Sequence, residues 1–206
     1  LIGIQYIDLF FGTQPKTTEN TDSIKVLSYN VHLFNRYGWI AKADIKSEIA
    51  AFLKTEKADI LCIQEFYTPD EIPTLNYPHK HIGLQSKKNQ WHMAIYSNFP
   101  QINKATVSIK GERMNNTCIY SDLSIDTDTI RVYNIHLASN WFKNSDYSFL
   151  QNPKKETLKK GIKGIVERMK SSYKKRAEEA QVIKEHMQNS PFPIILCGDF
   201  NDTPLS

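Results

Sequence analysis

The chain has 206 residues, of which 40% are hydrophobic and 23% charged, and its formal net charge at pH 7 is +4. These values are typical of a globular protein and exclude an intrinsically disordered or fibrous chain. The length is sufficient for a full hydrophobic core, most simply in one domain. Cys62, Cys118 and Cys197 fall at scattered spacing inside apolar runs, which excludes a disulfide framework and a zinc site. We expect them to be small buried hydrophobic residues.

The chain begins with an apolar stretch, residues 1–11, that is shorter than the ~20 residues a membrane span requires. It is either the trailing edge of a removed membrane segment or a peripheral strand or helix packed on the domain. Residues 12–22 are rich in polar and turn-forming residues, which predicts a linker. We therefore expect an N-terminal apolar stub and linker at residues 1–22 and a domain at 23–206. A removed anchor would make the protein membrane-associated, and without one we expect it in the cytoplasm.

Short apolar runs rich in β-branched residues predict the strands. In chain order they cover residues 24–30, 59–65, 80–84, 91–97, 104–109, 117–125, 129–137 and 194–197. A helix is predicted over 44–57 and another over 154–188, because apolar residues recur there every three or four positions. Gly161 and Gly164 could divide the second helix into two. A strand–helix–strand unit beside strands that follow one another antiparallel predicts an α/β protein with mixed sheets.

Polar residues stand at the ends of four of these runs: Asn30, Glu65, His136, and the pair Asp199 and Asn201. In layered α/β folds the ligand crevice lies outside the strand ends, so these side chains are expected to converge. A structural explanation exists for most of them, such as an Asx turn at Asp199 or a hydrogen-bonded core histidine at His136. Glu65 is harder to explain in that way, because a carboxylate after an apolar strand needs a partner to offset its desolvation.

Five segments in order resemble the endonuclease/exonuclease/phosphatase superfamily: SYN, CIQE, IYSNFP, YNIHLAS and GDFNDTP, between about Ile24 and Pro204. The resemblance implies a four-layer α/β sandwich of two mixed β-sheets flanked by helices. It also implies hydrolysis of a phosphate ester with a divalent cation, Mg²⁺ or Mn²⁺. Family members end with a Ser-Asp-His signature after further strands, and this sequence has none. We therefore expect a fold truncated before its last strands, with an exposed apolar edge on the second sheet, and a segment that is inactive or badly impaired by itself.

Metal-assisted phosphoester hydrolysis assigns a role to each converging residue. Glu65 is expected to bind the metal, with Asn30 either binding it as well or supporting that ligand. Asp199 would orient or deprotonate the attacking water, and Asn201 would hold that water or the phosphate. His136 would donate a hydrogen bond to a phosphate oxygen.

Loops next to these strand ends offer candidates for substrate binding, namely Trp39, Asn140 and Trp141. Packing against the core or its rim is the alternative for the aromatic residues. The segment 140–151 is expected to be a loop.

The segment Lys154–Arg176 carries ten Lys or Arg residues against two Glu. This predicts either attraction to an anionic membrane surface or nucleic acid, or an ordinary solvated helix face. The expected partner is a phosphate-ester substrate, either nucleic acid, a phospholipid or a small phosphoester, and no obligate protein partner is inferred. The alternative to an enzyme is a non-catalytic phosphate- or membrane-binding module that retains the fold.

Overall fold

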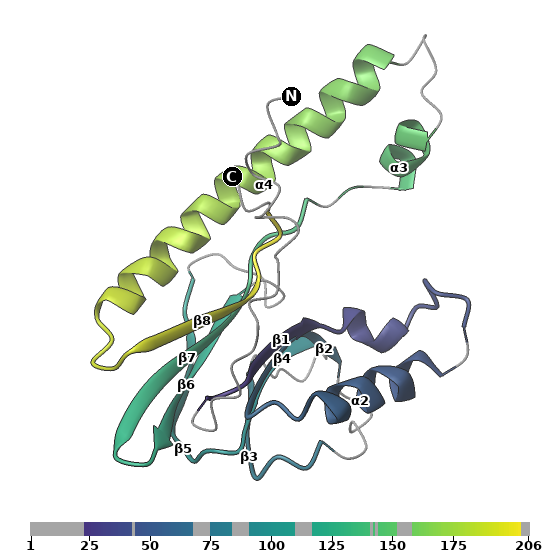
Figure 1. The fold of residues 1–206 in the computed structure, drawn as a ribbon. Helices are drawn as coiled ribbons and strands as arrows, with labels where there is room; N and C mark the ends of the chain where they lie inside the picture. Colours follow the sequence, from purple (N-terminus) through teal and green to yellow (C-terminus); the bar gives the residue numbers. More distant parts are fainter. Residues whose placement is uncertain are drawn as a thin grey trace, which may run out of the picture.

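The computed structural model describes residues 23–42, 44–67, 75–83, 91–109, 117–140, 142, 144–151 and 158–202. The predicted stub and linker at residues 1–22 lie outside these ranges, and so does Trp141. The described strands form two four-stranded sheets that pack face to face (Figure 1).

The first sheet has the strand order β1-β2-β4-β3. β1 (Val26–Asn30) pairs in parallel with β2 (Ile60–Tyr67). β4 (Trp91–Ser97) runs antiparallel to β2 on one side and to β3 (His79–Gly83) on the other. Helix α2 (Ile45–Glu56) connects β1 to β2, after the short 3-10 helix η2 at 32–35. The strand–helix–strand unit predicted from the sequence is therefore present.

The second sheet has the strand order β5-β6-β7-β8. β5 (Gln101–Val107), β6 (Thr117–Ile125) and β7 (Asp128–His136) are antiparallel neighbours, and β8 (Ile194–Asp199) is parallel to β7. β5 begins at residue 101, earlier than the predicted strand at 104–109. Each sheet thus combines parallel and antiparallel pairs, as predicted.

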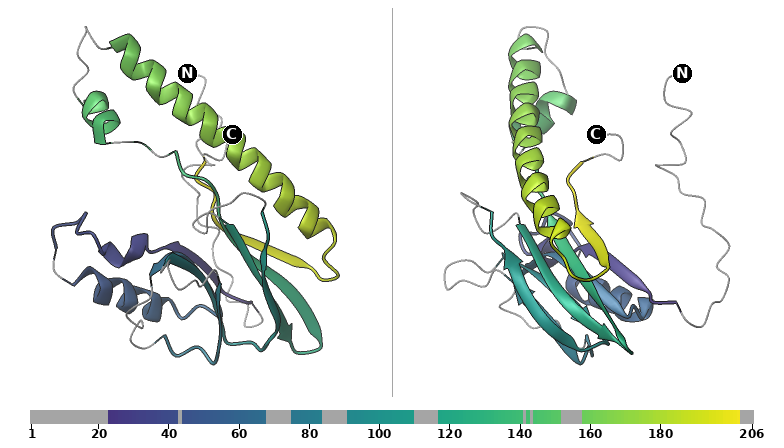
Figure 2. Two further views of the ribbon diagram at one scale, coloured as in Figure 1. Left: turned by 180° about the vertical axis from the view of Figure 1, so that it is seen from behind. Right: turned by 90° about the vertical axis from the view of Figure 1, so that its left-hand side faces the viewer.

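In the described residues, three clusters of buried apolar side chains lie between four successive layers. Figure 2 shows the helices and sheets that form these layers. Leu53 of α2 packs on the outer face of the first sheet. Residues such as Ile95 and Val132 fill the space between the two sheets. Ile183 of α4 (Leu158–Gln188) packs on the outer face of the second sheet. The predicted four-layer α/β sandwich is confirmed.

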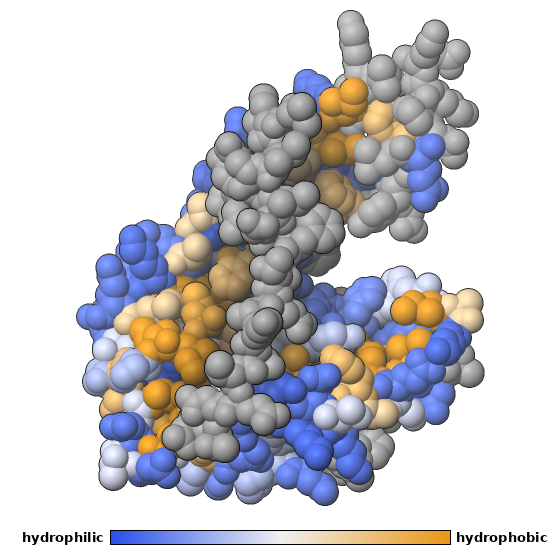
Figure 3. All heavy atoms as spheres, in the orientation of Figure 1, coloured by the Kyte–Doolittle hydropathy of each residue, from blue (hydrophilic) through white to orange (hydrophobic). Residues whose placement is uncertain are grey.

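Part of the apolar surface is exposed. Ile162 and Val166 on α4 are about half exposed, and Leu196 of β8 and the following Phe200 are more than one third exposed. Figure 3 shows apolar patches along α4 and over the second sheet. Leu196 lies on β8, which is the edge strand of the second sheet in the described part of the chain. In the described part of the chain, no helix combines the length and apolarity that crossing a membrane would need.

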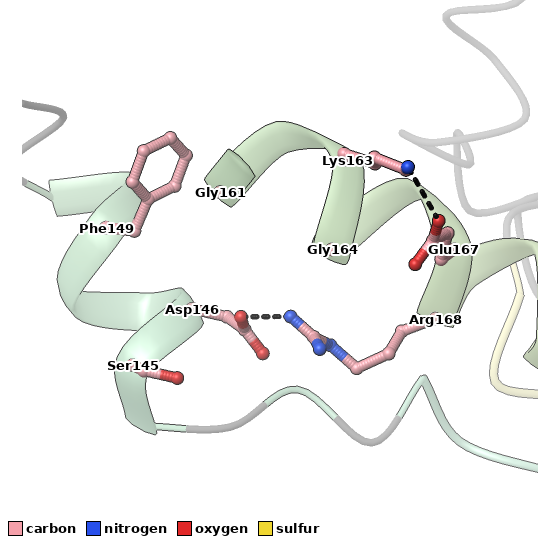
Figure 4. A pocket seen from close by; sticks show the side chains of 8 residues that line it. All are labelled: Ser145, Asp146, Phe149, Gly161, Lys163, Gly164, Glu167 and Arg168. Atoms are coloured by element: carbon pink, nitrogen blue, oxygen red, sulfur yellow. Dashed lines mark hydrogen bonds and ion pairs between the residues drawn. The ribbon is translucent and has the colours of Figure 1, made fainter. Parts of the chain in front are cut away.

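One helical segment differs from expectation, and the second predicted helix is undivided. The predicted loop at 140–151 contains helix α3 (Asn144–Gln151), and α4 continues without a break through its glycines. A Cβ atom at Gly161 would lie 2.6 Å from the ring of Phe149 on α3. Figure 4 shows Phe149 facing Gly161, with Asp146 of α3 paired to Arg168 of α4. Gly161 therefore leaves room for α3 to pack instead of interrupting the helix.

The cysteines follow the prediction in two cases. Cys62 and Cys118 are fully buried, whereas Cys197 on the edge strand β8 is only partly buried. The pKa of Cys62 is raised well above its usual value, mainly by a hydrogen bond with Cys197 and to a lesser extent by burial. The Cys62 thiol is therefore protonated at neutral pH and acts as a packing residue.

Gly198, immediately before Asp199, is a position where only glycine fits. Its φ is +146°, and a Cβ atom there would lie 2.0 Å from the carbonyl oxygen of Ile135 on β7. We expect Gly198→Ala to lower the free energy of unfolding by about 2 kcal/mol or more, measured by urea denaturation, because the added methyl group clashes with the main chain of β7 and the backbone angle is strained for alanine.

Gly164→Ala is the matched control. A Cβ atom at Gly164 meets only the end of the Arg168 side chain, at 3.4 Å. Alanine should stabilise this helix position by up to about 1 kcal/mol. Equal losses of stability in the two variants would contradict the role given to Gly198.

Candidate active site

The ends of four strands bring the predicted polar residues together. β1 and β2 are parallel, as are β7 and β8, so the carboxyl ends of each pair lie at one edge of its sheet. Asn30 ends β1, His136 ends β7 and Asp199 ends β8. Glu65 lies near the end of β2, so the expected convergence is observed.

Asn30 lies at the centre of this group. Its Nδ2 donates hydrogen bonds to Glu65 Oε1 at 3.1 Å and to Asp199 Oδ2 at 2.8 Å. Its Oδ1 accepts a hydrogen bond from the main-chain N–H of His32 at 2.9 Å. These partners define which end of the amide faces the carboxylates. A single amide therefore connects one carboxylate of the first sheet with one of the second.

His136 completes the group. Its Nε2 lies 3.7 Å from Glu65 Oε1 and 4.0 Å from Asp199 Oδ2. The His136 side chain is 8% exposed, whereas those of Glu65 and Asp199 are 21% and 30% exposed. Both carboxylates are thus open to small ligands, and the histidine is held beside them.

The charge of this group favours a bound cation. Among the described residues, the ion pairs of Glu65 and Asp199 involve His136 and no lysine or arginine. Two neighbouring carboxylates with no lysine or arginine beside them repel each other unless a proton or cation lies between them. Across the described ranges, no group of three or more His, Cys, Asp or Glu side chains is spaced to enclose a metal. A cation that keeps several waters and takes one or two carboxylates, as Mg²⁺ does, fits this donor set.

Glu65 reaches the site because β2 contains a bulge. In a regular strand Gln64 and Glu65 would point to opposite faces of the sheet. The register between β2 and β4 shifts between Ile63 and Phe66, and Glu65 has a φ of +50°. Both Gln64 and Glu65 consequently bond to residues of the second sheet or to Asn30. The alternation of the sequence does not reveal this bulge.

Asn201 holds the turn that follows β8. Its main-chain N–H donates to Asp199 Oδ1 at 2.9 Å, and its Nδ2 donates to the carbonyl oxygen of Leu137 at 2.8 Å. The side chain therefore connects the segment after β8 to the segment after β7. In this arrangement Asn201 orients Asp199, and its amide nitrogen faces the main chain.

An open cavity of about 720 Å³ borders the site on the side of Asn30 and Asp199. Asn30 and Asp199 line one part of it, and Asn140, Met169 and Tyr173 line another. Its volume falls in the range of roughly 300–1,000 Å³ that is usual for small-molecule sites. Asn140, a predicted substrate-binding residue, is therefore placed in the same cavity as Asp199.

The two predicted aromatic residues are placed differently. Trp39 is 50% exposed, and its ring stacks on that of His32 with centroids 4.0 Å apart. Because His32 bonds to Asn30, Trp39 belongs to the loop beside the site, although it does not line the cavity. Trp141 lies outside the described residues.

Arg176 is the functional residue that sequence reasoning missed. The sequence places it in the basic segment 154–176, but it is buried, with 4% of its surface exposed. Its Nε donates to Asp202 Oδ2 at 3.0 Å, and its Nη1 donates to the Ala138 carbonyl oxygen at 2.9 Å and to Asn140 Oδ1 at 3.1 Å. Arg176 thereby holds the loops that follow both β7 and β8.

A signal for this role exists in the spacing along α4. Ser172, Arg176, Glu179 and Ile183 are all buried, at intervals of three or four residues. A charged residue in line with an apolar one on a helix face has to find a buried partner. Glu179 finds one as well, because its Oε2 accepts the main-chain N–H of Ala138 at 2.8 Å.

The basic segment is consequently less uniformly positive at its surface than its composition implies. Arg176 is buried, and Arg168 is paired with Asp146. Lys163 and Lys174 each lie near a glutamate one helical turn later. Attraction to an anionic membrane through this segment stays a prediction.

Comparisons with known proteins agree with this geometry. Residues 27–206 match the Endonuclease/Exonuclease/phosphatase family. Humanized D. rerio TDP2 with 14 mutations aligns with a TM-score of 0.61 and 12% identity, over 88% of this chain and 63% of that one. TDP2 from C. elegans aligns with a TM-score of 0.60 and 16% identity, over 96% and 57%. A β-hairpin deletion mutant of Staphylococcus aureus beta toxin aligns with a TM-score of 0.59 and 14% identity, over 89% and 69%. The comparison with curated proteins returned no match.

The chain therefore belongs to the endonuclease/exonuclease/phosphatase family. The low identities to the solved structures mean that the likeness concerns the fold. The chain spans 63% and 57% of the lengths of the two TDP2 structures.

The contacts of Arg176 predict a large effect on stability. Arg176→Ala should lower the free energy of unfolding by about 3 kcal/mol, because Asp202 loses a buried ion-pair partner and two further acceptors lose their donor. Urea denaturation measures the change. Lys174→Ala removes an exposed cation from the same helix, close to Arg176 in the sequence, and should change the free energy of unfolding by less than about 0.5 kcal/mol. Similar values for the two variants would show that Arg176 does not hold the loops.

Proposed function

We propose that the protein hydrolyses phosphodiesters with the help of a divalent cation. The observation that carries this proposal is the approach of Glu65 and Asp199 to one amide of Asn30, with His136 within 4.0 Å of both carboxylates. Membership of the endonuclease/exonuclease/phosphatase family supports the class of reaction.

Mg²⁺ or Mn²⁺ is the cation that we propose, with Glu65 as its main protein ligand. Asn30 would orient that ligand, since its Nδ2 donates to Glu65 and its oxygen is engaged by His32. When bound, such a cation neutralises charge on phosphoryl oxygens and on the leaving oxygen. The low number of protein oxygens at the site suits an ion that retains several waters.

The chain's own side chains divide the remaining tasks. Asp199 is the carboxylate more open to solvent, so it would accept a proton from the attacking water. The N–H groups of Asn30 and Asn201 hold its two oxygens, which limits its rotation. His136 Nε2 would donate a hydrogen bond to a phosphate oxygen, where negative charge increases during the reaction.

The cavity supports a substrate larger than a simple phosphate. It continues from Asp199 to Asn140 and Tyr173, so a group attached to the phosphate would lie against them. One related structure is D. rerio TDP2 complexed with single strand DNA product. A nucleic-acid strand and a phospholipid headgroup both contain a phosphodiester, and either is compatible with this proposal.

Turnover of bis-p-nitrophenyl phosphate by the full-length protein tests the proposal, with Mg²⁺ and Mn²⁺ titrated separately. Glu65→Gln and Asp199→Asn should each reduce kcat/KM at least about 100-fold. The first removes the negative charge that would bind the cation, and the second removes the carboxylate that would accept the proton of the water. Glu185→Gln on the exposed end of α4 makes the same chemical change away from the site and should leave turnover unchanged.

Equal turnover by the wild-type protein and Glu65→Gln would reject the proposed reaction. Binding of inorganic phosphate with no turnover under any metal condition would instead favour the alternative of a non-catalytic phosphate-binding module.

A further inference from the structure

Two further polar side chains lie between the two sheets, and they are more deeply buried than the carboxylates. Gln64 of β2 and Asn134 of β7 are both fully buried, and they meet across the space between the sheets. Gln64 Nε2 donates to Asn134 Oδ1 at 2.6 Å and to Ser28 Oγ at 3.1 Å. The remaining contents of this space are largely apolar. A polar pair in that position has to be fully hydrogen-bonded to be tolerated.

Asn134 uses both of its N–H groups on the bulged part of the first sheet. Its Nδ2 donates to the carbonyl oxygen of Ile63 and to that of Ala94, each at 2.9 Å. Ile63 and Ala94 form the last regular pair of β2 and β4 before the register shift. One side chain of the second sheet therefore bonds to both β2 and β4 where the bulge begins.

The bulge needs such support. The left-handed backbone of Glu65, with a φ of +50°, is unfavourable for a residue with a side chain, and it persists only where surrounding contacts over-determine it. On the other side of β2, the N–H of Val31 donates to the carbonyl oxygen of Gln64 at 3.1 Å. Contacts from β7 and from the residue after β1 thus hold the bulge from both sides.

We propose that Asn134 is a positioning residue, which holds the β2 bulge in the shape that delivers Glu65 to the cation site. The proposal rests on the proposed role of Glu65 as a cation ligand. Asn134 itself bonds to Gln64 and to two main-chain carbonyl groups, so it would act on the ion through Glu65 and not as a ligand. Because Asn134 and His136 are two residues apart on β7, the same strand that carries the histidine would also control the glutamate.

A purely structural role is the competing explanation, in which Asn134 only satisfies polar groups between the sheets. Both explanations predict that a substitution lowers stability. They differ in the cation affinity that they predict for the variant, because mutating a residue that orients a metal ligand changes metal affinity by about 10- to 100-fold. They differ also in where the main chain loosens.

The experiment compares Asn134→Leu with Val132→Ala in the full-length protein. Leucine has a similar size but no hydrogen-bonding group, whereas Val132 is a buried apolar residue on the same strand. Mn²⁺ binding is measured as free Mn²⁺ by electron paramagnetic resonance, and hydrogen exchange is measured by mass spectrometry. We expect Asn134→Leu to raise the Mn²⁺ dissociation constant about 10-fold or more. It should also accelerate exchange in β2 relative to β6. Val132→Ala should do neither.

Asn134→Ser, which keeps one donor in a smaller side chain, replaces the leucine variant if that variant does not fold. We expect the same two changes in Asn134→Ser, with smaller magnitude.

Unchanged Mn²⁺ affinity and unchanged β2 exchange in a folded Asn134 variant would overturn the proposal, and so would equal changes in Val132→Ala. Absence of Mn²⁺ binding by both the wild-type protein and Glu65→Gln would refute the proposed function. The exchange measurement would then decide separately whether Asn134 holds the bulge.

Discussion

Two carboxylates that belong to different sheets share one amide, and the rest of the site depends on that contact. Glu65 comes from the first sheet and Asp199 from the second, and both accept hydrogen bonds from Asn30. The contact requires that the ends of β1 and β8 face each other across the sandwich. Packing of the apolar layer between the sheets therefore determines the distance between the two charges. The packing of the core thus sets the geometry of the site.

Some of the unfavourable backbone geometry of the chain lies at the same place. Glu65 and Asn201 both have left-handed backbone angles, and Gly198 has a conformation that only glycine tolerates without strain. Glu65 is itself a proposed cation ligand, and Gly198 and Asn201 lie within two residues of Asp199. Local strain at such positions is stable only when neighbouring hydrogen bonds compensate for it. Asn30, Asn134 and the main chain near Leu137 supply those bonds.

Helix α4 contributes to the site from the outer face of the second sheet. Ile183 anchors the helix in the core, and Arg176 and Glu179 reach the loop that follows β7. The same arginine also pairs with Asp202 after β8. Removing one partner of a buried ion pair of this kind leaves an uncompensated buried charge, which is strongly destabilising. The helix thus sets the relative position of the two loops that border the cavity.

Local patterns in the sequence determined most of the strands, the four-layer class of the fold, and the residues at the strand ends that converge. These features follow from apolar runs that each end in a polar residue. Residues close together in the sequence are enough to define such a pattern. The sequence missed helix α3, because its aromatic residues do not show a clear helical period. The direction of Glu65 and the burial of Arg176 were decided only by tertiary structure. A bulge exists only relative to the partner strand, and the acceptors of Arg176 lie 26 to 38 residues away, where no local pattern can indicate them.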